Sequence, residues 1–172
     1  YGRVHAPEKK GRIDLVTEFD KRSEALLLER IRSRYPDHAI LAEESGTHTG
    51  AQGARVRWIC DPLDGTTNFA HNYPFFAVSV AVEADGAPIA GAVYDPVRDE
   101  MFAAARGLGA TLNREPARVS GIERVADALL VTGFPYDIHK RIPEIVGLFG
   151  DFVGRARAVR RLGSAALDIC YV

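Results

Sequence analysis

Asp61 and Asp64 are the residues of this 172-residue chain whose type and spacing point most directly to chemistry. They stand three residues apart, on what we read as a tight turn after an apolar strand over 55–60. Such a turn can aim both carboxylates at one cation, with the Leu63 carbonyl oxygen between them. A set of oxygen ligands favours a hard cation, Mg²⁺ before Mn²⁺ or Ca²⁺. An ordinary Asp-Gly turn, which needs no metal, is the alternative interpretation.

Gly65 and Thr66 follow directly and can begin a helix. The free N–H groups and the dipole of a helix start bind phosphate oxygens. The alternative is a threonine N-cap without a ligand. Carboxylates beside an anion-binding helix start repel one another unless a cation lies among them. A carboxylate pair directly beside such a helix start is therefore hard to explain by structure alone.

Three further carboxylates are candidates for the same site. Glu43 and Glu44 end a short apolar strand over 39–42. If that strand lies beside the 55–60 strand, Glu43 completes the metal shell and Glu44 can hold a water; otherwise the pair belongs to a solvated loop. Asp14 precedes a predicted helix and would accept the hydroxyl proton of Thr66, which would activate a water. The alternative is that Asp14 only assists the helix cap.

A segment near the end of the chain, Gly163-Ser164-Ala165, is the candidate for substrate contact. Gly163 permits close approach of a ligand, and Ser164 can N-cap the last helix. The N–H groups of Ser164 and Ala165 could then meet a polyol or sugar. The two cysteines, Cys60 and Cys170, have no metal-binding spacing and are interpreted as reduced core thiols, with Cys60 facing away from Asp61.

The periodicity of the chain predicts an α/β layered fold. Its first part, 1–118, should contain a helix with Thr17 as N-cap and Asp20 completing a capping box. A polar loop over 45–54, a strand over 75–82 buried on both faces, and an antiparallel meander with an Asp85-Gly86 hairpin turn should follow. The second part, 119–172, should be a βαβ-like half with a helix over 138–153.

Composition excludes several classes of function. The net charge is −1, from 22 basic and 23 acidic residues, so nucleic acid is an unlikely bulk electrostatic partner. No apolar run approaches the roughly 20 residues of a membrane span. The chain begins at Tyr1 and stops at Val172 in an apolar helix, so we expect the natural protein to extend beyond both ends.

Taken together, the motifs resemble those of the inositol monophosphatase family. The resemblance covers nearly the whole chain in family order, and the 61–69 signature is highly specific. The matching segments are Asp14–Asp20, Glu43–Ser45, Asp61–Phe69, Gly91–Pro96, Gly107–Ala110 and Arg160–Asp168.

The resemblance implies an αβαβα sugar-phosphatase sandwich and Mg²⁺-dependent, Li⁺-sensitive hydrolysis of a phosphate monoester, with two or three ions per site. It implies that the metal ligands are Glu43, Asp61, the Leu63 carbonyl and Asp64. Asp14 and Thr66 would activate water, Gly65 and Thr66 would contact phosphate, and 163–165 would contact the substrate. In the family, the sequence continues to a Trp-Asp motif that lies beyond this chain. Family members are often homodimers, so a homodimer is expected. The expected location is cytoplasmic.

Our leading hypothesis for the function is hydrolysis of inositol 1-phosphate. A sister activity on histidinol-phosphate, fructose-1,6-bisphosphate, NADP or 3′-phosphoadenylate is the alternative within the enzyme class. From another class, the chain could be a regulatory interaction protein of the transcription machinery. An arginine cluster is compatible with that role: Arg155, Arg157, Arg160 and Arg161.

Overall fold

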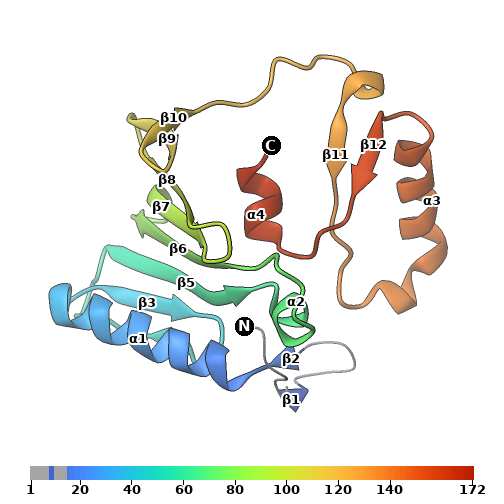
Figure 1. The fold of residues 1–172 in the computed structure, drawn as a ribbon. Coiled ribbons are helices and arrows are strands. Elements are labelled where there is room, and N and C mark those ends of the chain that lie inside the picture. Colours follow the sequence, from blue (N-terminus) through green and yellow to red (C-terminus); the bar gives the residue numbers. More distant parts are fainter. Residues whose placement is uncertain (1–7, 10–14) are drawn as a thin grey trace.

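The computed structural model describes residues 8–9 and 15–172 of the chain. Its centre is one eight-stranded sheet with the order β10-β9-β8-β7-β6-β5-β3-β4 (Figure 1). Neighbouring strands are antiparallel except β3 and β5, which run parallel. The strands of this sheet are β3 (Ala39–Ala42), β4 (Gly46–His48), β5 (Val56–Asp64), β6 (Ala77–Ala84), β7 (Ala87–Asp95), β8 (Glu100–Ala105), β9 (Gly109–Leu112) and β10 (Glu115–Ala117).

The remaining elements lie around this sheet or form small sheets of their own. β11 and β12 form a parallel pair joined through α3, the predicted βαβ arrangement, and β1 pairs with β2. Their bounds are β1 (Glu8–Lys9), β2 (Leu15–Val16), α1 (Glu18–Arg34), α2 (Thr66–Ala70), β11 (Leu129–Val131), α3 (Ile142–Val153), β12 (Ala158–Arg160), α4 (Ala165–Cys170) and the 3₁₀ turns Val125–Asp127 and Ile138–Lys140. In the described part of the chain, no helix has the length and apolar character needed to span a bilayer.

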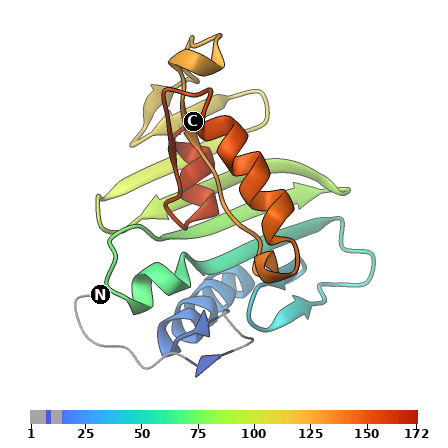
Figure 2. The same cartoon turned by 90° about the vertical axis from the view of Figure 1, so that its right-hand side faces the viewer.

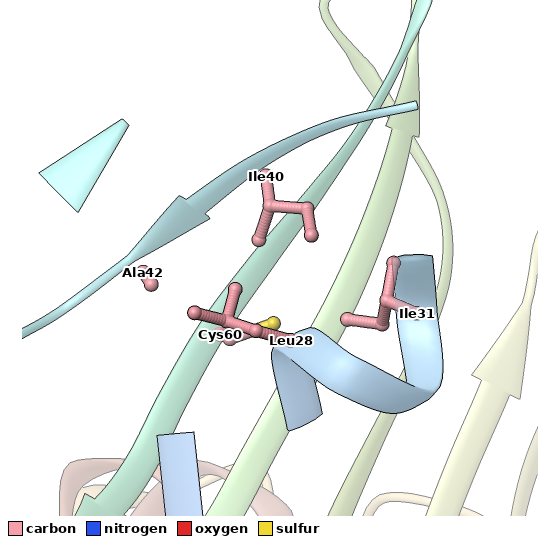
Figure 3. Packing of buried hydrophobic residues seen from close by; sticks show 5 residues of the cluster. All are labelled: Leu28, Ile31, Ile40, Ala42 and Cys60. Atoms are coloured by element: carbon pink, nitrogen blue, oxygen red, sulfur yellow. The ribbon is translucent and has the colours of Figure 1, made fainter. Parts of the chain in front are cut away.

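α1 begins where the sequence predicts. Thr17 is the N-cap, its hydroxyl accepts the Phe19 N–H, and the Asp20 carboxylate accepts the Thr17 N–H at 2.8 Å, which completes the capping box. Leu28 and Ile31 then share one face of the helix and pack on Ile40, Ala42 and Cys60 of the sheet (Figure 3). This cluster fixes α1 against β3 and β5.

α4 packs against the other face of the sheet. Leu167 contacts Phe75, Ala77 and Phe102, whereas the α1 cluster contains Cys60. Val80, the register partner of Cys60, packs with the α1 cluster, whereas Ala77, three residues earlier on β6, packs with Leu167. Strand residues an odd number of positions apart face opposite sides of a sheet. The sheet is therefore a middle layer between α1 and α4, as Figures 1 and 2 show.

Three local expectations are corrected. The 45–54 segment is not only loop, because β4 pairs with β3 as a polar edge strand that begins at Gly46, whose φ is +76°. The 75–82 segment is not buried on both faces: β6 starts at Ala77, and its later residues are half-buried because α1 and α4 each cover only part of the sheet. The 138–153 helix begins at Ile142, since Pro143 in its first turn lacks the N–H that an earlier start would need.

Candidate functional site

Asp61 and Asp64 lie on the irregular end of β5. The tight turn that the sequence predicted for them is wrong. The pairing with β6 shifts register between these two residues. Pro62 has no N–H to give to a neighbouring strand, which confines it to such an irregularity. Asp61 Oδ1 accepts the Leu63 N–H at 3.0 Å and stabilises the bend. The bulge lets two carboxylates on one strand turn toward different partners.

Glu43 is the partner of Asp61. β3 lies beside β5, which was the condition for Glu43 to join the site, and the two strands run parallel. The Glu43 N–H lies 3.1 Å from the Cys60 carbonyl oxygen. The Asp61 and Glu43 side chains are therefore close enough to affect each other's ionisation. Burial raises the pKa of Asp61; the Glu43 hydrogen bond opposes this, and the negative charge of Asp64 adds to it.

Asp64 faces the start of α4. Its Oδ2 accepts the Ser164 hydroxyl at 2.6 Å and the Ala166 N–H at 2.7 Å, and its Oδ1 accepts the Ala165 N–H at 3.3 Å. Ser164 is the N-cap of α4, as expected. The donors predicted for a polyol are therefore directed at Asp64 in this structure, and their contact with substrate stays a prediction.

Gly65 and Thr66 begin α2, the helix start predicted for phosphate. Gly65 has φ +93°, and a Cβ there would lie 3.0 Å from the Phe75 carbonyl oxygen, so the position requires glycine. Thr66 Oγ1 lies 3.0 Å from both Asp20 Oδ1 and the Leu63 carbonyl oxygen. The single hydroxyl proton of Thr66 is thus shared between two acceptors.

The other catalytic candidates stay predictions. Asp14 lies outside the described residues, so its pairing with Thr66 is untested. Glu44 is half-buried, and its N–H is bound to Glu24 Oε2 at 2.8 Å. Its hold on a water stays a prediction.

Sequence reasoning missed Glu24, the site role of Asp20, and Asn68. Asn68 donates to the carbonyl oxygens of Phe75 and Leu162, which joins α2 to the segment before α4. A helical-spacing signal was present for two of them, because Asp20 and Glu24 share a face with Leu28 and Ile31. That face is buried, so its two carboxylates had to find internal partners.

A cavity of about 680 Å³ opens beside the end of β5 and the start of α2. Asp64, Gly65 and Thr66 line one side, and the segment 131–136 lines another. Asp168 also lines it; its Oδ1 is buried and has no hydrogen-bond partner in the described structure. Burial and the charge of Asp64 raise the pKa of Asp168, against the effect of Arg161. The cavity has room for a small ligand.

The donor set fits Mg²⁺. Glu43, Asp61, Asp64 and the Leu63 carbonyl supply oxygen only. Burial, and to a lesser extent the charge of Asp64, raise the pKa of Asp61, and a bound divalent cation would favour its charged form. Among the described residues, no three His, Cys, Asp or Glu side chains converge as a ready metal cluster. Mg²⁺ rarely needs one, since one or two carboxylates, waters and a substrate phosphate usually complete its shell.

Curated relatives match this chain over most of its length. It is 49% identical over 170 residues to an inositol-1-monophosphatase of Synechocystis sp., covering 98% of this chain and 59% of that protein. It is 46% identical over 164 residues to the Nus factor SuhB of Haemophilus influenzae, covering 95% and 61%. The chain thus spans about three fifths of the length of these relatives.

Solved structures agree in fold. The crystal structure of the extragenic suppressor protein SuhB from Bartonella henselae has a TM-score of 0.91 at 38% identity, over 98% of this chain and 64% of that one. An IMPase/NADP phosphatase complexed with Mg²⁺ and phosphate has a TM-score of 0.81 at 25% identity, over 98% and 62%. The expected α/β fold is confirmed.

The family comparison agrees with the motifs and with the geometry. The model described as "Inositol monophosphatase family" matches residues 2–172. The family is named for a phosphatase, one similar structure holds Mg²⁺ and phosphate, and the oxygen donors at the end of β5 suit that ion. This chain belongs to the inositol monophosphatase family.

Proposed function

We propose that this protein hydrolyses a small phosphate monoester with Mg²⁺, with inositol 1-phosphate as the leading substrate. The observation that carries the proposal is the pairing of β3 with β5, which places Glu43 beside Asp61 on the strand that leads into α2. The 680 Å³ cavity bordered by Asp64, Gly65 and Thr66 provides space for the substrate next to them.

The chain's own residues would divide the work in this reaction. Glu43, Asp61, Asp64 and the Leu63 carbonyl would hold Mg²⁺, which when bound polarises phosphoryl oxygens and lowers the pKa of water. Gly65 and Thr66 would orient the phosphate through their N–H groups. Asp14 would accept the Thr66 hydroxyl proton in the working enzyme, replacing the present acceptors, Asp20 and Leu63.

Asp64 would also organise the substrate side. Its hydrogen bonds to Ser164, Ala165 and Ala166 hold the start of α4 at the mouth of the cavity. A carboxylate has about four acceptor positions, and three are used here, so one stays available to a cation. Asp64 thus connects the proposed metal ligands with the segment 163–165 proposed to meet the polyol.

The test measures phosphate release from inositol 1-phosphate at increasing Mg²⁺ concentrations. Release should require Mg²⁺ and fall more than about 100-fold in Asp64→Asn, since even the outer partners of metal ligands cost about 10- to 100-fold when removed. Asp151→Asn is the matched control, because Asp151 is an exposed residue of α3 and should leave the rate unchanged. Undiminished release in Asp64→Asn contradicts the proposal.

A substrate panel separates the sister activities. Histidinol-phosphate, fructose-1,6-bisphosphate, NADP and 3′-phosphoadenylate should each be hydrolysed more slowly than inositol 1-phosphate. A faster rate on one of them, with the same Mg²⁺ requirement, transfers the proposal to that substrate, because the predicted metal ligands are common to all of these activities.

A second candidate function is a regulatory interaction, favoured by the 46% identity to a relative named Nus factor SuhB. Arg157, one of the four clustered arginines, is exposed and lies 3.6 Å from Asp127. Capture of a transcription-complex protein by this chain, undiminished when Asp61 and Asp64 are both changed to Asn, would support this role. Homodimer formation and a cytoplasmic location stay predictions beside both candidates.

A further inference from the structure

The N-terminal half of α1 carries three polar residues on one face, Asp20, Ser23 and Glu24, which we name the α1 polar stripe. Their spacing of three and four residues places them side by side on the helix. Asp20 is 0% exposed and Glu24 is 4% exposed. Charged residues are rarely buried so deeply unless their hydrogen bonds are satisfied, so the contacts of the stripe identify what it is for.

Each member of the α1 polar stripe holds a different segment of the site. Asp20 Oδ1 is 3.0 Å from the Thr66 hydroxyl at the start of α2. The Ser23 hydroxyl donates to the Pro62 carbonyl oxygen at 2.9 Å, in the bulge of β5. Glu24 accepts two N–H groups from the turn after β3, as described next. One helix face therefore connects the turn after β3 with the adjoining end of β5 and start of α2, all of them distant from α1 in sequence.

Glu24 clamps the turn that carries Glu43. Its Oε2 accepts the Glu44 N–H at 2.8 Å and its Oε1 accepts the Ser45 N–H at 3.0 Å. On the other side of Glu43, the backbone is fixed by the bond from its own N–H to the Cys60 carbonyl oxygen at 3.1 Å. The backbone at Glu43 is thus held immediately before and immediately after the side chain that meets Asp61.

We propose that Glu24 is a positioning residue that fixes the Glu43 carboxylate for Mg²⁺ binding. The proposal rests on the proposed function to the extent that Glu43 is taken as a metal ligand. Glu43 itself is exposed, so the backbone clamp acts together with its contact to Asp61 in limiting where its carboxylate can reach. Residues that orient metal ligands typically change metal affinity by about 10- to 100-fold when they are altered.

The carboxylate of Glu24 is chemically suited to the clamp. It accepts two parallel N–H groups, and a hydrogen bond to a charged acceptor is stronger than one between neutral groups. A glutamine at this position has one acceptor oxygen and one NH₂ donor. Glu24→Gln would therefore keep one bond and point a donor at the other N–H, which loosens the turn while nearly preserving side-chain volume.

The experiment measures Mg²⁺ binding by calorimetric titration, without substrate. It compares wild type, Glu24→Gln and Glu29→Gln. Glu29 is an exposed residue of the same helix, so Glu29→Gln should bind Mg²⁺ like wild type. In Glu24→Gln the Kd for Mg²⁺ should rise about 10-fold or more. Hydrogen exchange at the Glu44 and Ser45 amides should also become faster.

Kinetics distinguish positioning from a general loss of structure. In Glu24→Gln the Mg²⁺ concentration for half-maximal phosphate release should rise, while kcat and substrate KM at saturating Mg²⁺ stay near wild type. A merely structural role would lower kcat without moving the Mg²⁺ dependence, and that result overturns the proposal. If Glu24→Gln does not fold, Glu24→Asp serves instead, because its shorter side chain keeps the charge but cannot bridge both amides.

The possible failures can be told apart. A wild-type protein that neither binds Mg²⁺ nor releases phosphate overturns the proposed function and the role of Glu24 together. A Mg²⁺-dependent wild type whose Glu24→Gln variant binds Mg²⁺ equally well overturns only the role of Glu24.

Discussion

The region formed by α1, β3 and β5 and the region formed by β11, α3 and β12 differ in how they bury apolar side chains. In the first, Leu28, Ile31, Ile40, Ala42 and Cys60 form a buried cluster (Figure 3). In the second, no residue between 119 and 163 is buried, and every residue of that range is described. On α3, Leu148 is 61% exposed and Val146 is 51% exposed.

The difference separates two tasks of the site. The proposed metal ligands stand on the well-packed region, where the α1 polar stripe ties three segments to one helix face. The 131–136 side of the cavity belongs to the weakly packed region. Sites that need accurate geometry are better built on rigid elements, whereas segments with few buried contacts open more easily. We expect metal binding to depend on the first region and substrate choice on the second.

Matched leucine substitutions on the two helices should have the largest effect. Leu28→Ala removes a side chain from the buried cluster and should lower the free energy of unfolding by about 2–5 kcal/mol. Leu148→Ala should change it by no more than about 0.5 kcal/mol, because that side chain is exposed. Urea denaturation measures both. Equal losses would show that something covers α3 in solution and would remove the contrast.

The pH dependence of stability should report on Cys60, a free and buried thiol of the first region. Burial, and to a lesser extent the charge of Glu24, raise its pKa to about 11. Between the ordinary thiol pKa and that value, the folded protein keeps a proton that the unfolded chain loses, so stability falls as pH rises, by at most about 1.4 kcal/mol per pH unit.

Urea denaturation of wild type and Cys60→Ala between pH 8 and 10.5 isolates this contribution. Tyrosine and lysine titrations are common to both proteins, so the stability of Cys60→Ala should fall less steeply. Parallel curves would mean that the thiol ionises as easily in the folded protein as in the unfolded chain, and that the first region is more open than its packing indicates.

The smallest effect is expected at the junction of the two regions. Ser164→Ala removes the N-cap of α4 and the 2.6 Å hydrogen bond to Asp64, and should cost about 0.5–2 kcal/mol. Ser120→Ala, at an exposed position, is the control and should be silent in thermal denaturation. A silent Ser164→Ala would indicate that α4 is held by Leu167 and its neighbours alone.

The sequence by itself determined features that depend on neighbouring residues. The capping box of Thr17 and Asp20, the N-cap at Ser164 and the hairpin turn at Asp85-Gly86, whose two φ angles are positive, all form where they were predicted. The reason is that each rests on hydrogen bonds or backbone preferences within about four positions of the chain. The family motifs were equally local, since each motif is a short run of side chains.

Only the tertiary structure decided which of those side chains meet. The Asp64–Ser164 contact joins residues 100 positions apart, and the contacts of Asp20 with Thr66 and of Glu24 with Glu44 span 46 and 20 positions. Asp61 and Asp64, expected on one turn, face Glu43 and α4 instead, because the β5 bulge separates them. Such partners depend on how helices and strands pack, and a buried carboxylate takes the donors that the packing brings within reach.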